Sequence, residues 1–200
     1  LVNIQPHEVE PLRQLFQQQN RPPPILYPMV RGRLVGINDT AVGPDHFQNE
    51  RAQLLVSREF NLSWTTHIQE DNRVTAGRWW TTKQPAAAEF SLEQGVAKSL
   101  GLKLGDRLRF RATGKEFEAK VTSLRSVKWD SFNVNFFVIA TPGVLEKYPA
   151  TYVTSFYLGA DQSDFLIQLV RQFPSITVLD VRSFMDQVRK VIEHASLAIE

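Results

Sequence analysis

The stretch Ser91–Val127, SLEQGVAKSLGLKLGDRLRFRATGKEFEAKVTSLRSV, contains the clearest secondary-structure pattern in the chain. A helix is predicted over Glu93–Leu100, and the glycine that follows is suited to end it because glycine readily adopts the left-handed conformation. Strands are predicted over 107–112 and 116–126, joined by a tight turn at Thr113-Gly114. Apolar and charged residues alternate along both strands, which indicates one buried and one solvated face. The middle of the chain is therefore predicted to be rich in β-structure.

The start of the chain has a different pattern, a strand followed by a helix and then a second strand. Residues Leu1–Gln5 alternate as a short strand does. A helix is predicted from Pro6 to the proline run NRPPP at 20–24, because proline is tolerated at the first position of a helix but cannot continue one. An extended run then follows over 25–38.

The end of the chain repeats this order. A strand is predicted over 151–160, and Asp161 is the predicted N-cap of the helix that follows. Pro174 ends that helix, the segment SITVLDV at 175–181 is predicted to be the next strand, and a final helix is predicted over 182–199. The strand-helix-strand order therefore occurs at both ends of the chain.

Each strand-helix-strand unit is too small to bury its own helix, so we expect the two units to pack together as one layer. The predicted fold class is α+β, with this split layer and a β-rich subdomain inserted into it. The boundaries that follow are 1–40 and 149–200 for the layer and 41–148 for the insertion.

Composition limits the classes of function. The 23 basic and 21 acidic residues leave a net charge of only +2, which is not the basic footprint of a nucleic-acid-binding protein. The turn GLKLGD at 101–106 resembles turns in DNA-binding modules, but its glycines, aspartate and leucines also suit an ordinary turn. It lacks the Lys-Ser/Thr pair of a phosphate-binding loop. The chain has no cysteine, which excludes disulfides, thiolate metal sites and a cysteine nucleophile. No cofactor or metal is expected.

No pattern of catalytic residues stands out. The four histidines have no metal-ligand spacing. Ser63 and Ser155 lie in strand-like sequence without a GxSxG elbow, so structural hydroxyl groups are the preferred interpretation and a nucleophile the alternative.

The four tryptophans, Trp64, Trp79, Trp80 and Trp129, have two interpretations. Clustered aromatic side chains can line a surface for a partner or a hydrophobic cargo, or they can fill the core of the insertion. The run from Val134 to Thr141 is apolar on both faces, which is typical of a strand buried on both sides. We therefore expect Trp129, Phe136 and Val138 to be mainly buried.

Five segments taken in order resemble the YbbP-type permeases of the MacB/FtsX-like ABC transporter superfamily. The resemblance covers nearly the whole chain, and the ordered set is specific although each piece alone is weak. The segments are REFNLSW (58–64), NRVTAGRWW (72–80), LEQGVAKSLGLKLGDRLRF (92–110), VTSLRSVKWDSFNVNFFVIATPG (121–143) and YVTSF (152–156).

This resemblance implies an extracytoplasmic domain on the periplasmic side of the bacterial inner membrane. Its expected parts are a membrane-proximal, Porter-like layer and an inserted, Sabre-like subdomain, with membrane helices joined to both ends of the chain. A separate cytoplasmic ATPase would drive the domain, which would itself be non-catalytic. The expected cargo or partner is a hydrophobic or lipid-like molecule, or a periplasmic esterase or lysophospholipase.

The alternative from another class is a soluble enzyme of lipid metabolism or an independent binding module. An enzyme would need a concave site that holds a titratable group with a perturbed pKa and a paired base.

Overall fold

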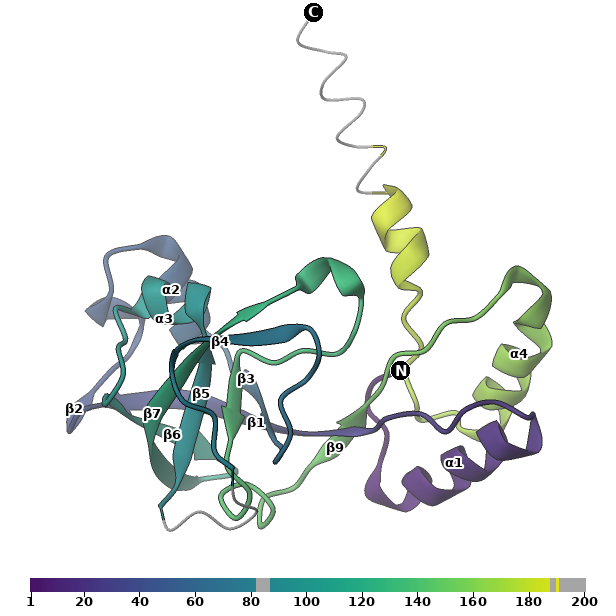
Figure 1. Ribbon diagram of the computed structural model, residues 1–200, viewed down its shortest axis with the longest axis horizontal. Coiled ribbons are helices and arrows are strands. Elements are labelled where there is room, and N and C mark those ends of the chain that lie inside the picture. The colour runs from purple at the N-terminus through teal and green to yellow at the C-terminus, as the bar shows by residue number, and fades with distance from the viewer. Residues whose placement is uncertain (82–86, 188–189, 191–200) are drawn as a thin grey trace, which may run out of the picture.

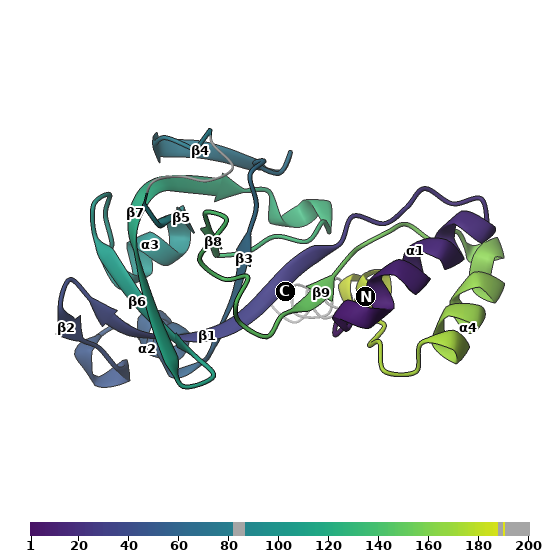
Figure 2. The ribbon, with the colours of Figure 1, turned by 90° about the horizontal axis from the view of Figure 1, so that it is seen from below.

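In the computed structural model, which describes residues 1–81, 87–187 and 190, strands pair into a closed ring at one end of the molecule (Figures 1 and 2). The order around the ring is β1, β3, β8, β5, β7 and β6, and β6 returns to β1. The pairs β3–β8 and β5–β7 are parallel and the others are antiparallel. The ring strands are β1 (Tyr27–Ile37), β3 (Phe60–Trp64), β5 (Glu89–Glu93), β6 (Arg107–Ala112), β7 (Lys115–Val127) and β8 (Val138–Ala140).

The remaining elements extend or cover this ring. Strand β2 extends β1 at one end, β9 pairs with β1 at the other, and β4 pairs with β7. Their bounds are β2 (Thr40–Ala41), β4 (Asn72–Gly77) and β9 (Thr151–Val153). The α-helices are α1 (Val9–Gln18), α2 (Glu50–Ser57), α3 (Gln94–Leu100) and α4 (Ser163–Gln172). Short 3-10 turns are η1 (Pro6–Glu8), η2 (Pro44–His46), η3 (Trp129–Ser131) and η4 (Ala160–Gln162).

The β6–β7 hairpin forms as the alternation predicted. Ala112 pairs with Lys115 across the turn, where Thr113 and Gly114 both have positive φ, 48° and 77°. Phe117, Ala119 and Val121 on β7 point into the ring and are buried, and a register shift after Val121 then places Leu124 against the same core. The predicted helix over 93–100 is also confirmed as α3.

Apolar side chains from all six strands fill the ring. Phe110 on β6 meets Phe60 and Phe90 edge-on, with ring centroids 5.6 and 5.5 Å apart, and stacks against Phe117 at 6.0 Å. Helices α2 and α3 pack against the same cluster through buried residues such as Val56. We call the ring with α2 and α3 the lobe.

The two ends of the chain share a second, smaller core. Phe16 on α1 packs edge-on against Phe165 on α4, with ring centroids 5.0 Å apart, and Phe173 belongs to the same cluster. The buried members of this cluster are Leu1, Ile4, Leu12, Leu15, Phe16, Phe165, Leu169, Phe173 and Ile176. We call α1, α4 and the segments around them the end layer, which lies beyond the end of β1 in both views (Figures 1 and 2).

Several predicted elements of the end layer are shorter than expected. The strands predicted over 1–5 and 175–181 form only isolated bridges, Val2 with Thr177 and Ile4 with Tyr152. Asp161 lies within η4 and does not cap α4, whose N-cap is Gln162. The predicted final helix is seen over 181–187, and the remainder of that prediction lies almost wholly outside the described residues. Within the described ranges, no helix combines the length and hydropathy needed to cross a membrane.

Strand β1 connects the end layer to the lobe without interruption. Its first residues, Tyr27–Met29, pair with β9, and the next, Val30–Gly32, pair with β3 inside the ring. From Arg33 to Ile37 it pairs with β6. One continuous strand therefore belongs to the ring and to the segment that leads into the end layer (Figure 2).

Candidate functional site

The four candidate tryptophans do not form one cluster. Trp79 and Trp80 stack on each other with ring centroids 4.1 Å apart, and Trp80 is buried against Phe136 and Ile139. Trp64 is half-buried against the main core of the lobe.

Trp79 and Trp80 are fixed by hydrogen bonds as well as by packing. The indole nitrogen of Trp79 donates to the carbonyl oxygen of Thr66 at 3.0 Å, and that of Trp80 donates to Thr65 at 2.8 Å. A buried indole N–H needs such a partner, so these two side chains serve the interior of the domain.

Trp129 differs from the other three. It lies in η3 with 49% of its surface exposed, in edge-on contact with Phe137 at 5.4 Å. The expectation that Trp129 is mainly buried is wrong, whereas Phe136 and Val138 are buried as expected, with 4% and 1% exposed. Of the four tryptophans, Trp129 is the one that a partner could reach.

The segment before β8 is held mainly by a buried arginine. The guanidinium group of Arg125, which is fully buried, donates from Nη2 to the carbonyl oxygens of Phe136 and Phe137, at 3.0 and 3.2 Å. Its Nε donates to the Ser91 hydroxyl at 2.8 Å, and Nη1 donates to the Asn72 side chain. The Phe136 carbonyl thus has Arg125 as its donor, the Phe137 carbonyl also accepts from the backbone N–H of Glu93 at 2.8 Å, and the paired strand β8 starts at Val138.

Burial lowers the pKa of Arg125 to about 10, because a charged guanidinium is costly to remove from water, while the charge of Glu93 acts in the opposite direction. The hydrogen bonds to oxygen atoms compensate this cost. Arg125 was missed as a functional candidate. The alternation along β7 did not reveal it, because the register shift after Val121 places Arg125 on the face away from the core of the ring.

The tip of the same loop is tied down by Asp71. Its carboxylate accepts from the Ser131 hydroxyl and from the Asn133 amide, both at 2.7 Å. These hydrogen bonds lower the pKa of Asp71, with the Ser131 contact the larger cause. Between the two partners, Phe132 has φ +62° and is 49% exposed. A large side chain rarely adopts this left-handed conformation, so its neighbours must impose it.

A groove lies between this loop and helix α2. Its volume is about 340 Å3, and Trp129, Phe137, Leu54 and the two arginines Arg51 and Arg58 contribute to its walls. Leu54 is 56% exposed, an unusual position for a large apolar side chain on a short helix. We call this feature the Trp129 groove.

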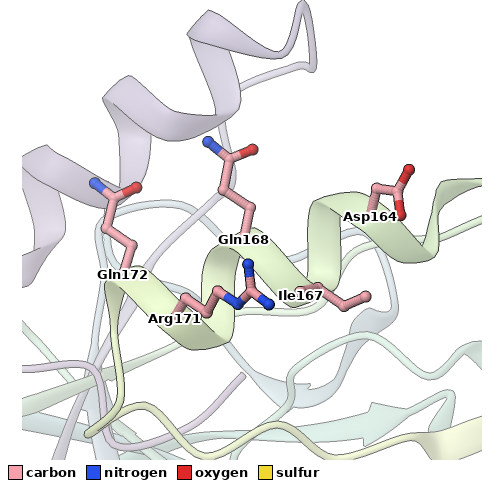
Figure 3. Close-up of a pocket in the computed structure, with 5 residues that line it drawn as sticks. All are labelled: Asp164, Ile167, Gln168, Arg171 and Gln172. Carbon is pink, nitrogen blue, oxygen red and sulfur yellow. The ribbon is translucent and has the colours of Figure 1, made fainter.

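A second hollow, of about 470 Å3, lies beside α4 (Figure 3). The side chains of Gln168 and Gln172 point toward α1, and Gln168 accepts a hydrogen bond from Gln19 at 3.0 Å. The other lining residues, Asp164, Ile167 and Arg171, come from the same helix. Groups from one helix face do not converge on a reacting atom, so we assign no chemistry to this hollow.

The serines considered as nucleophiles have no catalytic partners here. Ser63 is 3% exposed, and its hydroxyl donates to the carbonyl oxygen of Pro28 at 2.6 Å. Ser155 lines an open hollow together with Pro22–Pro24, and no described histidine contacts either serine. In the part of the chain that the structure describes, no three His, Asp or Glu side chains gather as a metal site would require.

Comparison with known proteins gives a whole-chain match. The chain is 39% identical over 200 residues to an uncharacterized ABC transporter permease, YbbP, of Escherichia coli strain K12. The match covers 100% of this chain but spans only 24% of the length of that permease.

Comparisons with family models and with solved structures do not extend this match. No model of a known protein family matches the chain. A crystal structure described as a domain of a permease protein from Porphyromonas gingivalis overlaps 78% of this chain and 66% of its own, with 8% identity and a TM-score of 0.35. This overlap is too low to carry an argument.

Proposed function

Since this chain is a homologue, along its whole length, of a segment of an ABC transporter permease, we propose that it is the extracytoplasmic domain of such a permease. In this role it transmits conformational change from the membrane to a hydrophobic or lipid-like cargo or to a periplasmic partner. The energy comes from a separate cytoplasmic ATPase, and the domain itself carries out no reaction.

The observation that carries this proposal, beside the homology, is the position of the first residues relative to residues 177–187. Val2 forms a bridge with Thr177, so the first residues lie beside the segment that leads into the helical residues 181–187. The N-terminus and the start of that helix are neighbours in both views (Figures 1 and 2). A domain inserted between two membrane helices needs its entry and exit close together in this way.

The two cores support the proposed division of the chain. The proposed membrane-proximal, Porter-like part is residues 1–40 and 149–200, which include the end layer, and the proposed inserted, Sabre-like part is residues 41–148. Strand β1 takes part in both, because its Val30–Ile37 portion completes the ring of the lobe.

The mechanism follows from this connection. A tilt of the helix that begins at residue 181 would displace the end layer through the Val2–Thr177 bridge. Strand β1 and its partner β9 would pass the displacement to the lobe, because a paired strand cannot bend freely without breaking ladder hydrogen bonds. The lobe would then move as a rigid body.

The location is tested in the full permease with a single introduced cysteine. Lys115 is exposed in the β6–β7 turn, and the segment has no cysteine of its own. Lys115→Cys should react with a membrane-impermeant maleimide in intact cells, as judged against the same permease without the substitution. Reaction only after the inner membrane is permeabilised would place the domain in the cytoplasm and refute the proposal.

A further inference from the structure

The Trp129 groove presents apolar surface between two cationic groups. Arg51, Leu54 and Leu55 lie on one face of α2, and Arg58, the residue just after the helix, lines the same groove. The two arginines stand seven residues apart, about 10 Å along the helix axis. Trp129 forms the opposite wall. The groove thus has an apolar centre and a positive charge toward each end.

These arginines have no partner among the described residues. Neither Arg51 nor Arg58 forms a hydrogen bond or an ion pair there, in contrast to Arg107 and Arg111 on the β6–β7 hairpin, which pair with carboxylates. Both side chains therefore remain available to an anionic ligand.

The other charged residues around the groove are also mostly positive. Arg31 lies across the β1–β3 ladder from Asn61, a residue of the groove wall, and Arg33 donates to the carbonyl oxygen of Ser57 at the end of α2. The acidic groups of this region are Glu50 and Glu59. Four arginines against two glutamates give a local net charge of +2, equal to that of the entire chain.

The loop that carries Trp129 is fixed before any ligand arrives. Arg125 fixes the C-terminal end of the loop by hydrogen bonds to Phe136 and Phe137, and Asp71 fixes the tip of the loop. Between these ties Trp129 remains half exposed. A site that is rigid in the free protein loses little conformational entropy when it binds.

We infer that the Trp129 groove docks an extended acidic peptide segment of a partner protein, with a large apolar side chain between two carboxylates. This inference rests on the proposed function, which puts the lobe where such a partner could reach it. In an extended peptide, carboxylates four residues apart point to the same side as the side chain midway between them, and they are separated by about 13 Å. The long side chains of Arg51 and Arg58, about 10 Å apart along the helix axis, can reach both. The apolar side chain between them would lie on Leu54 and Trp129.

A peptide fits this groove better than an isolated lipid or other small ligand. Small ligands bury most of their surface in concave sites, whereas Leu54 and Trp129 form an open wall. The side-chain amides of Asn61 and Asn135 in the groove wall can both donate to and accept from a peptide backbone. Tryptophan and arginine are also the residue types most enriched at the energetic centres of protein interfaces.

The test is selection of binders from a random peptide library displayed on phage, with the purified chain as the target. Selected peptides are expected to carry two acidic residues about four positions apart with a large apolar residue midway between them. Each is then synthesised and its affinity measured for the wild type, for Trp129→Ala, and for the double variant Arg51→Glu, Arg58→Glu. Arg171→Glu on α4 serves as a charge-reversal control outside the groove, and the melting temperature of every variant checks that it folds.

We expect both groove variants to weaken binding at least about tenfold, a typical loss at such interface residues, and Arg171→Glu to leave it unchanged. Affinity should also fall as salt is added, because exposed charge pairs are screened. Selected peptides without the acidic pattern, or with equal affinity for the groove variants, would overturn the inference. A further contradicting result would be binding of phosphatidylglycerol vesicles that depends on Arg51 and Arg58 when no peptide binding does. The groove would then be a lipid-binding surface. None of these outcomes affects the maleimide test of location.

Discussion

The lobe and the end layer are stabilised in different ways. The lobe has a closed ring of paired strands around the larger core, in which Phe110 alone contacts three other aromatic rings. The end layer has two helices over a core of nine buried residues, and its own strand pairing is limited to isolated bridges. Segments from opposite ends of the chain make up that smaller core.

This difference suggests a division of labour. In the proposed function, the lobe is the part that keeps its shape, and its surface carries the Trp129 groove. The end layer depends on contact between distant parts of the chain, so its geometry is sensitive to how the two chain ends are held. A part of this kind is suited to receive a displacement, and a closed ring is suited to present a surface without deforming.

The largest loss of stability is expected for Phe110→Ala in the lobe. Removing a buried phenyl ring leaves a cavity and costs about 3–5 kcal/mol of unfolding free energy. Chemical denaturation measures this change, and Phe132→Ala, which truncates an exposed ring, is the control. If the two variants lost equal stability, the interior of the ring would not be the main source of stability.

Leu169→Ala in the end layer should have a smaller and more local effect. Leu169 is fully buried, and its truncation should fall at the lower end of the range of about 2–5 kcal/mol, because a small layer can partly collapse around the cavity. Hydrogen exchange should accelerate in α1 and α4 while β6 and β7 remain protected. Leu54→Ala on α2 is the matched exposed control. Uniform acceleration over the whole chain would contradict the independence of the lobe.

Arg125→Met should affect the order of the loop more than global stability. The substitution leaves the carbonyl of Phe136 without a donor, at a cost of about 1–3 kcal/mol, whereas the carbonyl of Phe137 keeps its hydrogen bond from the Glu93 backbone. It also removes a buried charge, which offsets part of that loss. Limited proteolysis should cut the variant between residues 128 and 137, whereas the exposed control Arg111→Met resists. Wild-type resistance in Arg125→Met would show that Arg125 does not hold the loop.

The smallest effect concerns Asp71 and pH. Its pKa is lowered in the folded protein, so its contribution to loop order is present at neutral pH and is lost as pH falls through that lowered pKa, below the ordinary aspartate value of about 3.9. Amide signals of Lys128–Asn133 in NMR spectra should broaden or shift in that range. This pH-dependent change in the amide signals should be absent in Asp71→Asn. If the change persisted, another carboxyl group would be its cause.

Local patterns were sufficient to predict the β6–β7 hairpin and α3. Both depend on neighbours in sequence, such as the glycine after α3, which adopts the expected left-handed conformation with φ 66°. The clustering of Phe16 with Phe173 also follows from the helical spacing of apolar residues near each chain end.

The site was harder to predict because its contacts are between distant segments. The exposure of Trp129 depends on Arg125 and Asp71, and neither pairing has a sequence signature. The strands predicted near the two chain ends form only isolated bridges, because each finds a backbone partner at a single residue pair. A longer ladder needs partners along several residues, and the sequence pattern does not show where they lie. The groove itself appears only when α2 and the Trp129 loop come together across the fold.

The central claim is that the end layer and lobe move together when the transporter works. The most direct measurement is the distance between spin labels at Lys115→Cys in the lobe and Gln172→Cys in the end layer, in the full permease assembled with its ATPase. The account predicts the same distance distribution with and without ATP, while a pair joining Lys115→Cys to a site in the membrane domain changes. A change in the lobe-to-layer distance on ATP binding would contradict the account, because β1 would then act as a hinge and not as a rigid connection.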